Sequence, residues 1–307
     1  KRQVQQQIAH GTADHRQPAM AGAAHQHLDQ QRRHPWQIQR WQGMGLAHRP
    51  HPPGSVQTGS IRFTSLSRST PDRPTLPLVV ITVAYDSQAA IEQLASDLAR
   101  QNQAPQQWLV VDNAPLSAPL LVTPPLQTAA ARRLQGREGA GFGAGCNQAF
   151  ESLAAEAWQG WVWLLNPDTR LTSPDVLARL TALQAALSPQ AVLGTAVFTS
   201  EGKLEADGGW IDAGLAFRRR RLGPELLEAG RHQPLAVDWL SGCSLALQPG
   251  AHVPPARFDP AFPLYYEDMD LCLRLGQGGA PVLWSAAVAI EHQRSTGSGG
   301  SGDCLLY

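Results

Sequence analysis

Three acidic residues follow short apolar stretches of the sequence. Asp86 comes soon after "LVVITVA", Asp112 ends "QWLVVD", and Asp168 follows "WVWLLNP". Such apolar, β-branched runs are typical of strands that are buried on both faces of a parallel sheet. Because ligands of an open α/β sheet bind at the carboxyl ends of its strands, we expect the three carboxylates at one edge. Any one of them alone could equally cap a helix or form a turn.

The segment "LLNPDTRL" offers the most specific chemistry of these three. A buried strand would deliver Asn166 and Asp168 to the sheet edge, and Pro167 would stiffen the turn between them. A carboxylate and an amide oxygen suit a hard divalent cation, Mg²⁺ or Mn²⁺, that also binds a diphosphate. The segment therefore predicts a metal and diphosphate site at this edge.

A second acidic group lies in "FPLYYEDMDLCLRLGQGG", at the start of a helix predicted over residues 268–276. Negative charge there complements the helix dipole, and Asp270 with Arg274 has the i,i+4 spacing of an ion pair. The adjacent Glu267 and Asp268, preceded by two tyrosines, exceed what a helix cap requires. A carboxylate whose pKa is raised by acidic neighbours and by enclosure could accept a proton from a hydroxyl group.

Two further features need an explanation. His292 follows the last predicted strand directly, so it is either a ligand at the same edge or a structural histidine. The stretch "GREGAGFGAGCNQAF" carries a glycine at every second position from Gly139 to Gly145. A dinucleotide fingerprint needs its glycines in the turn after the first strand, and that strand runs into "AYDS" instead. This excludes such a dehydrogenase, and we expect the loop to let the backbone pass close to a bound nucleotide.

The predicted elements that position these residues alternate as in an open α/β sheet. One helix is expected to begin with Ser173 as N-cap and Pro174 at its first position. Beyond Gly202, the strand candidates "AVDWL" and "CSLALQ" and a strand pair around "APVLWSAAVAIEH" predict a mixed, partly antiparallel half. The alternating strands and helices are predicted over residues 78–84, 88–101, 107–113, 142–157, 161–166, 173–187 and 191–198.

Composition divides the chain into a basic tail and an acidic body. Residues 1–73 hold ten Arg and Lys against three acids, and seven of the ten histidines lie in the first 51 residues. Because this region has no apolar period, it cannot offset the entropy of ordering a chain. We expect a disordered, Gln/His/Pro-rich tail over residues 1–75, a folded domain over 76–298 and a short tail over 299–307. Since the chain begins with Lys1 rather than Met, an incorrectly assigned start is an alternative account of the tail.

The cysteine spacing and the lack of long apolar runs indicate which cellular compartment and which partners to expect. The four cysteines lack C-x-x-C spacing, which argues against a zinc module or a disulfide scaffold and favours a reducing compartment. The sequence shows neither an apolar run of about 18 residues nor a signal-peptide core. We therefore expect a cytoplasmic protein, with peripheral contact at the inner face of the cell membrane left open. Nucleic acid is not expected as a partner, although basic tails can serve that role.

Taken together, the motifs resemble glycosyltransferase family 2, the inverting enzymes of the GT-A fold, in its rhamnosyltransferase-like branch. The resemblance covers about residues 78–298 and implies an α/β GT-A domain with a central, mostly parallel mixed sheet. The sequence departs from the family pattern at Asp86 and Gly139, where Asn is usual. The motifs occur in the family's order: "VVITVAYDS", "VVDNA", "GFGAGCNQA", "LLNPDT", "DWLSGCSLAL", "FDPAFPLYYEDMDLCLRL" and "IEHQRSTGS".

The resemblance also implies roles for individual residues. Asp268 would be the catalytic base, with Glu267 as the first acid of the pair, and Asp168 and His292 would bind Mg²⁺ or Mn²⁺. The acceptor, a glycan or lipid-linked glycan, would lie beside Trp239, Ser241 and Gly242. The nucleotide-diphosphate sugar donor would contact Thr82, Ala84, Tyr85, Asp86, Asp112, Gly141, Asn147 and Asn166.

The implied function is inverting transfer of a sugar, for which this branch suggests rhamnose, in building a polysaccharide or glycolipid of the cell envelope. A second interpretation is a catalytically impaired or truncated relative that only binds a nucleotide sugar or a partner protein, because the chain stops soon after the His292 motif. A nucleotidyltransferase would need a basic glycine-rich loop directly after the first strand, which is absent.

Overall fold

Parallel strands form the first half of the main sheet. In the computed structural model, β1 (Leu78–Ala84) pairs in parallel with β2 (Gln107–Asp112) on one side and with β4 (Trp161–Leu165) on the other. Strand β3 (Ala131–Gln135), which the sequence analysis did not predict, adds in parallel to the outer edge of β2. Strands β1, β2 and β4 are buried almost throughout, as their apolar, β-branched sequences predict.

The structure describes residues 78–129, 131–205, 208–212 and 218–293. The tails predicted over residues 1–75 and 299–307 lie outside these ranges, as does most of the motif that follows His292. Of the helices within the ranges, none combines the length and the apolar character that crossing a bilayer requires.

The second half of the main sheet is mixed, as predicted. Strand β11 (Ser244–Leu247) lies antiparallel between β4 and β6 (Val192–Thr199), and β12 (Val282–His292) runs parallel to β6. The short strands β5 (Thr169–Arg170) and β9 (Leu235–Ala236) pair antiparallel with β12. The strand order is β3-β2-β1-β4-β11-β6-β12-β5, which confirms a central sheet of both parallel and antiparallel strands.

The predicted strand pair around "APVLWSAAVAIEH" is wrong, because this segment forms the single strand β12. Its register against β6 breaks between Ser285 and Ala289, so residues 286–288 have no partner in β6. The hydroxyl of Ser285 accepts the N–H of Ala287 at 3.2 Å, which closes the bulge locally. A bulge of this kind interrupts the pairing with the neighbouring strand while the strand itself continues.

A small antiparallel sheet has the strand order β10-β7-β8. Its strands are β7 (Gly208–Asp212), β8 (Arg218–Arg221) and β10 (Trp239–Leu240). The predicted strand "AVDWL" is therefore divided between β9 and β10. Asp238 stands at the break, and both its backbone N–H and its carboxylate bond to β7, at 2.8 Å each, which directs the chain into the small sheet.

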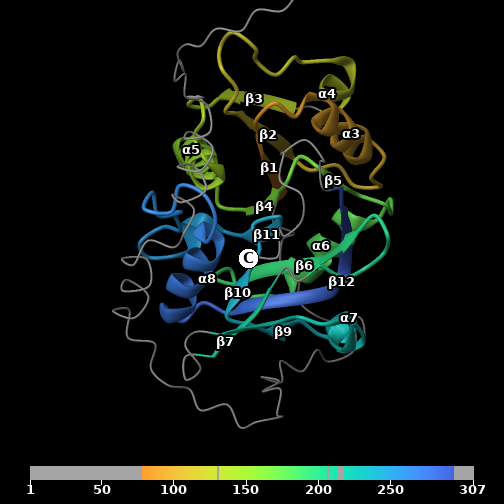
Figure 1. The fold of residues 1–307 in the computed structure, drawn as a ribbon, viewed down its shortest axis with the longest axis vertical. Coiled ribbons are helices and arrows are strands. Elements are labelled where there is room, and N and C mark those ends of the chain that lie inside the picture. The colour runs from red at the N-terminus through yellow and green to blue at the C-terminus, as the bar shows by residue number, and fades with distance from the viewer. Residues whose placement is uncertain (1–77, 130, 206–207, 213–217, 294–307) are drawn as a thin grey trace, which may run out of the picture. The chain divides into compact units, whose positions relative to one another are not determined.

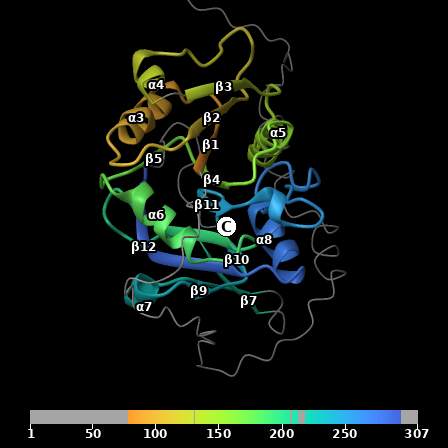
Figure 2. The ribbon, with the colours of Figure 1, turned by 180° about the vertical axis from the view of Figure 1, so that it is seen from behind.

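Helices cover the main sheet from both sides. Figures 1 and 2 show α5 and α8 on one side of the strands and α3 and α6 on the other. The α-helices are α3 (Gln88–Ala99), α4 (Pro124–Thr128), α5 (Phe142–Ala155), α6 (Val176–Ala185), α7 (Leu227–His232) and α8 (Glu267–Gln277), with 3-10 turns η2 (Pro224–Leu226) and η3 (Pro249–Ala251).

The predicted start of helix α6 at Ser173 is wrong, because its N-cap is Asp175 and its first residue is Val176. The hydroxyl of Ser173 bonds to the carboxylate of Asp175, which also accepts Nε of Arg179 at 2.8 Å. Two residues that could each cap a helix thus interact with one another, and the second of them occupies the cap position.

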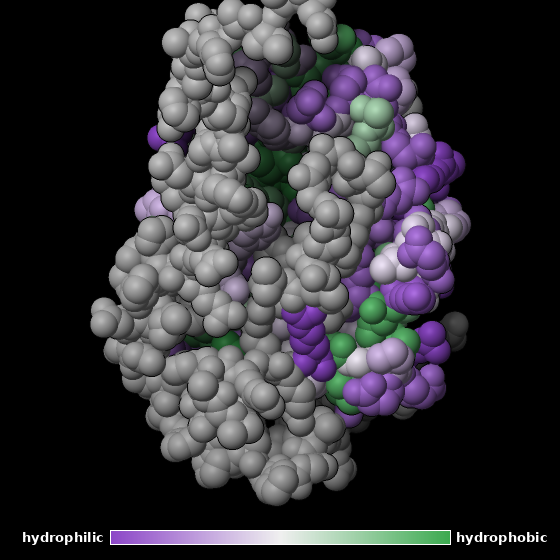
Figure 3. Space-filling view, in the orientation of Figure 1, coloured by the Kyte–Doolittle hydropathy of each residue, from purple (hydrophilic) through white to green (hydrophobic). Residues whose placement is uncertain are grey.

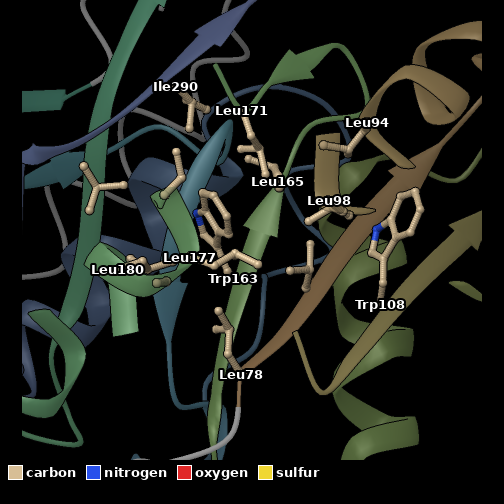
Figure 4. Close-up of a cluster of buried hydrophobic side chains, with 14 of the residues drawn as sticks. Leu78, Leu94, Leu98, Trp108, Trp163, Leu165, Leu171, Leu177, Leu180 and Ile290 are labelled. Atoms are coloured by element: carbon tan, nitrogen blue, oxygen red, sulfur yellow. The ribbon is translucent and has the colours of Figure 1, made fainter. Parts of the chain in front are cut away.

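The main hydrophobic core lies between the sheet and helices α3 and α6. Figure 4 shows Leu177 of α6 beside Trp163 of β4, with the leucines of α3 on the other side of that strand. Two of the buried indoles in this core have partners for their N–H groups: Trp163 donates to Ser244 Oγ at 2.9 Å and Trp108 to Thr82 Oγ1 at 3.0 Å. These two large side chains therefore fill the core without leaving their polar group unsatisfied.

Polar side chains predominate on the outer side of these helices. In Figure 3 the hydrophilic residues gather along the right-hand side, where α3, α6 and α7 lie in Figure 1. Exposed large apolar side chains within the described ranges lie outside the helices and strands, at Tyr85, Leu116, Leu121, Val122, Val253, Leu264 and Tyr265.

The alternate glycines at the start of α5 allow close packing inside the protein. A Cβ at Gly141 would lie 1.9 Å from the carbonyl oxygen of Pro263, one at Gly143 would lie 2.9 Å from Phe258, and one at Gly145 would lie 2.7 Å from Val83. The helix therefore approaches both β1 and the segment that precedes α8. These contacts account for the glycine spacing without a ligand.

We expect Gly141→Ala to lower the free energy of unfolding by about 2 kcal/mol, because the added methyl group overpacks against rigid backbone. Urea denaturation would measure the change. Gly250→Ala is the control, since the nearest atom to its added Cβ lies 3.9 Å away. Equal stabilities of the two variants would contradict the packing explanation.

Candidate active site

The three acids predicted at strand ends follow β1, β2 and β4, which are parallel neighbours, so they meet at the same edge of the sheet. Asp86 is exposed and has a φ of 47°, in the left-handed region. Asp and Asn adopt this conformation more readily than other residues with a side chain. The turn after β1 thus explains why an Asp can stand where the family usually has Asn.

The first-strand segment offers two of its four predicted donor residues as exposed side chains. Tyr85 is 59 % exposed and Asp86 is also exposed, whereas Thr82 and Ala84 are buried. The hydroxyl of Thr82 accepts the indole N–H of Trp108, and the carbonyl of Ala84 accepts the N–H of Asn113 at 2.8 Å. Donor contacts from Thr82 and Ala84 stay predictions, and in this conformation both residues form hydrogen bonds within the protein.

Asp112 is 1 % exposed and its carboxylate organises the loop that follows β2. One oxygen accepts the N–H of Ala114 at 3.1 Å, and the other accepts the N–H of Leu120 at 2.7 Å and Nε of Arg133 at 3.0 Å. Both oxygens are therefore engaged within the protein. The predicted contact of Asp112 with a nucleotide base is not tested by this geometry, but the carboxylate already has a structural role.

Asn147 connects α5 to the segment that precedes α8. Its Nδ2 donates to the carbonyl of Phe258 at 2.8 Å, and its Oδ1 accepts the N–H of the same residue at 2.9 Å. Together with the contact of Gly141 against Pro263, this bidentate bond fixes the segment against the helix. Gly141 and Asn147 were predicted to bind the donor, and the structure gives both of them an internal packing role.

The turn that carries Asn166 and Asp168 is held from several directions. The N–H of Asn166 donates to the carbonyl of Cys243 at 3.0 Å, and the carbonyl of Asn166 accepts the Thr169 hydroxyl at 2.7 Å. The carbonyl of Asp168 accepts the N–H of Gln293 at 2.8 Å. The turn is thus fixed between β11 and the end of β12, with both predicted side chains half-buried.

His292 lies beside Asp168, as the prediction of a shared site requires. Its Nε2 is 3.2 Å from Asp168 Oδ1, and its Nδ1 is 3.1 Å from Glu205 Oε2. Burial lowers the pKa of His292, but the hydrogen bonds and charges of Asp168 and Glu205 outweigh it and raise this pKa to about 9. Glu205 was not predicted, because it lies in an irregular loop whose sequence gives no signal.

Asp97, which the sequence analysis also missed, binds the residues that follow the turn of Asn166 and Asp168. This α3 carboxylate is buried and accepts Nε of Arg170 at 2.8 Å and the N–H of Leu171 at 3.0 Å. Arg100 forms a second ion pair with it. Its place three residues after Leu94, on the edge of the apolar helix face, is the signal that could have found it.

The Glu267 and Asp268 pair begins helix α8, and both residues are buried. Asp268 Oδ2 accepts the N–H of Gly242 at 2.8 Å. Glu267 Oε2 is buried without a hydrogen-bond partner in the described structure. Burial, with the negative charge of Asp268 next to it, raises the pKa of the Glu267 carboxyl to about 8.

The predicted i,i+4 pair in α8 is present, with Arg274 Nε donating to Asp270 Oδ2 at 2.8 Å. Asp270 is fully buried, so the pair is a part of the fold rather than of the surface. It fixes the first turns of α8 to the rest of the protein, since Arg274 also donates to the carbonyl of Arg257.

The predicted acceptor-side loop contacts Asp268 through its backbone. Gly242 supplies the N–H described above, and Ser241 Oγ accepts the N–H of Cys243 at 3.2 Å. Trp239 is only 2 % exposed, so its ring packs inside the protein in this conformation. The role of these three residues toward an acceptor stays a prediction.

Comparison with known proteins gives matches to curated proteins and to solved structures, but no family model matches. The chain is 25 % identical over 252 residues to the N-acetylglucosaminyl-diphospho-decaprenol L-rhamnosyltransferase of Mycobacterium tuberculosis (strain CDC 1551 / Oshkosh), covering 72 % of this chain and 78 % of that protein. The protein of the same name in strain ATCC 25618 / H37Rv matches equally. The crystal structure of GalNAc-T7 with UDP, GalNAc and Mn²⁺ superposes with a TM-score of 0.52 at 12 % identity, over 72 % of this chain and 44 % of that one.

The chain has the GT-A fold, and its sequence is similar to that of a rhamnosyltransferase. The resemblance and the fold class inferred from the sequence are thereby confirmed. The relatives named above are glycosyltransferases.

We expect Asp97→Ala to lower the free energy of unfolding by about 3 kcal/mol, because it leaves the partly buried Arg170 without its partner and the N–H of Leu171 unsatisfied. Chemical denaturation would measure the loss. Glu151→Ala removes a carboxylate from an exposed ion pair with Arg257 and should change stability far less. Similar losses in both variants would contradict the anchoring role of Asp97.

The pKa of Glu267 predicts a pH dependence of stability. Because this pKa is raised in the folded state, the folded protein binds more protons than the unfolded chain between about pH 4.5 and pH 8. Stability contributed by the protonated group is therefore lost as the pH rises through this window. In Glu267→Gln, the free energy of unfolding measured from pH 5 to 9 should fall less steeply than in the wild type. Glu138→Gln, which changes an exposed residue, should follow the wild type, and a parallel slope for Glu267→Gln would refute the assignment.

Proposed function

We propose that the protein is an inverting glycosyltransferase whose domain comprises residues 76–298. One observation supports the proposal: the consecutive residues Gly242 and Cys243 each hydrogen-bond to one of the two chemical groups of the site. The carbonyl of Cys243 accepts the N–H of Asn166 at 3.0 Å, and the N–H of Gly242 donates to Asp268 at 2.8 Å. A diphosphate site and a base within reach of one another are what transfer from a nucleotide-diphosphate sugar to a hydroxyl group requires.

Asp168 and His292 would hold a divalent cation, Mg²⁺ or Mn²⁺, whose binding would release the proton that the raised pKa leaves on His292 at neutral pH. Within the described ranges no group of three or more His, Cys, Asp or Glu could hold a metal, so diphosphate oxygens and water would complete the ligand set. This suits Mg²⁺ and Mn²⁺, which often take one or two protein carboxylates together with substrate phosphates. Glu205 on Nδ1 orients the imidazole so that Nε2 faces Asp168. When bound, the cation would neutralise charge on the diphosphate leaving group.

Asp268 would act as the base. Gly242 donates its N–H to one carboxylate oxygen at 2.8 Å, and Met269 donates its N–H to the other at 2.7 Å. A carboxylate oxygen has more than one lone pair, so these bonds are compatible with accepting the proton of an acceptor hydroxyl group. The hydroxyl oxygen forms a bond to the anomeric carbon as the bond from that carbon to the diphosphate breaks, and in-line attack inverts the configuration. Because Glu267 has a pKa of about 8, it is protonated at neutral pH and adds no second negative charge beside the base.

The donor and acceptor follow from the named relatives. Their name specifies an L-rhamnosyl group and an N-acetylglucosaminyl-diphospho-decaprenol. We propose a rhamnosyl donor and a lipid-linked sugar diphosphate as acceptor for this chain. The reaction would then take place at the cytoplasmic surface of a membrane. Exposed Tyr85 and Asp86 are the side chains available to a donor after β1.

A thermal-shift titration of the full chain with UDP, dTDP and GDP, each with and without Mn²⁺, tests the donor site. A nucleotide at about a hundred times its dissociation constant should add about 2.7 kcal/mol of stability. We expect one nucleotide to stabilise the protein only with Mn²⁺, and Asp168→Ala to abolish the shift. Asp268→Asn should retain the shift and lose sugar transfer.

The outcomes separate the interpretations. Absence of a shift with every nucleotide in a folded sample would contradict the donor site. A shift without transfer in the wild type would favour a relative that binds a nucleotide sugar without turning it over.

A further inference from the structure

Two consecutive tyrosines before the catalytic pair have left-handed backbone conformations. Tyr265 has a φ of 64° and Tyr266 a φ of 67°. For a residue with a side chain this conformation costs about 1–2 kcal/mol, whereas glycine adopts it freely. Strain of this kind persists where the surrounding structure imposes it, and it gathers at functional sites.

The surrounding structure holds this segment at both ends. Phe262 is 2 % exposed, and its N–H donates to the carbonyl of Asp259 at 3.0 Å. The carbonyl of Pro263 packs against Gly141 of α5, where a side chain would not fit. On the other side, the carbonyl of Tyr266 accepts the N–H of Asp270 at 2.9 Å, within the first turn of α8. Tyr265 is thus presented from a fixed backbone.

The side chain of Tyr265 faces outward to a large extent. It is 40 % exposed, and the preceding Leu264 is 55 % exposed. Because the side chain of Tyr265 is only partly buried, its burial offsets only part of the free-energy cost of the left-handed backbone. Glycine at this position would avoid that cost. Trp239, the aromatic residue predicted beside the acceptor, is buried instead. An exposed aromatic ring is consequently available next to the catalytic pair from Tyr265.

The distance along the chain fits the size of one sugar. Asp268 lies three positions after Tyr265, so their Cα atoms are at most about 11 Å apart. A pyranose ring whose hydroxyl group reaches Asp268 can extend over that distance. One face of many pyranoses carries mainly C–H groups, which pack favourably on the face of an aromatic ring.

We propose that Tyr265, with Leu264, forms a platform that binds the C–H face of the acceptor's terminal pyranose ring and sets which hydroxyl group faces Asp268. This inference rests on the proposed function, because it needs a sugar acceptor at Asp268. It assigns acceptor binding to the segment before α8 rather than to the ring of Trp239. Donor binding at Asp168 is independent of it.

Tyr265→Gly is the most informative variant, because glycine removes the ring and also relieves the left-handed strain. Its melting temperature should equal or exceed that of the wild type, so loss of binding would not reflect unfolding. Tyr265→Phe keeps the ring and should retain binding of the sugar probe. Leu116→Ala, which removes an exposed apolar side chain from the loop after β2, is the control for general surface effects.

Binding is measured on the full chain by saturation-transfer NMR with methyl N-acetylglucosaminide, in the presence of the nucleotide that gives the thermal shift and of diamagnetic Mg²⁺ in place of Mn²⁺. We expect Tyr265→Gly to weaken binding of this probe about tenfold while the nucleotide shift is unchanged. Wild-type probe affinity in Tyr265→Gly, with the nucleotide shift intact, would overturn the platform and leave the donor site standing. Absence of both the nucleotide shift and probe binding in the wild type would overturn the proposed function, and the platform with it.

Discussion

The site depends on the backbone of Gly242 and Cys243. The carbonyl of Cys243, directly before β11, accepts the N–H of Asn166, while the N–H of Gly242 bonds to Asp268 of α8. The antiparallel insertion of β11 beside β4 is what brings these partners together. A purely parallel sheet would need a crossover connection at this point, and the loop before β11 would not end beside the turn after β4.

Buried carboxylates extend this arrangement to the neighbouring elements. Asp97 and Asp268 each accept a backbone N–H from a segment distant from their own helix, and Asp112 accepts N–H groups of the loop that follows its strand. Removing a charge from water is costly unless it is paired and hydrogen-bonded, so these residues fix the loops they contact in one arrangement. The edge of the sheet is thereby preorganised, as a site that positions two substrates requires.

The sequence predicts well what depends on local pattern. The β-branched runs define β1, β2 and β4 almost to the residue, and the motifs of α8 and of the turn after β4 point to the residues that the structure brings beside β11. It predicts poorly what depends on distant contacts. The glycines of α5 serve packing against Pro263, Phe258 and Val83, and such partners cannot be read from spacing alone. Strand β3 was missed because its residues alternate between partial burial and exposure, with two arginines at its centre.

The number of residues in the bulge of β12 determines the face of the strand on which His292 lies. Side chains alternate between the two faces of a strand, and residues 286–288 enter β12 without a partner in β6. An odd number of extra residues reverses the phase of the strand beyond them, which decides the face on which His292 emerges. Loss or gain of one residue in this stretch would turn the imidazole away from Asp168, whereas loss or gain of two would keep its face. The number of residues in segment 286–288, more than their identity, thus determines whether His292 contacts Asp168.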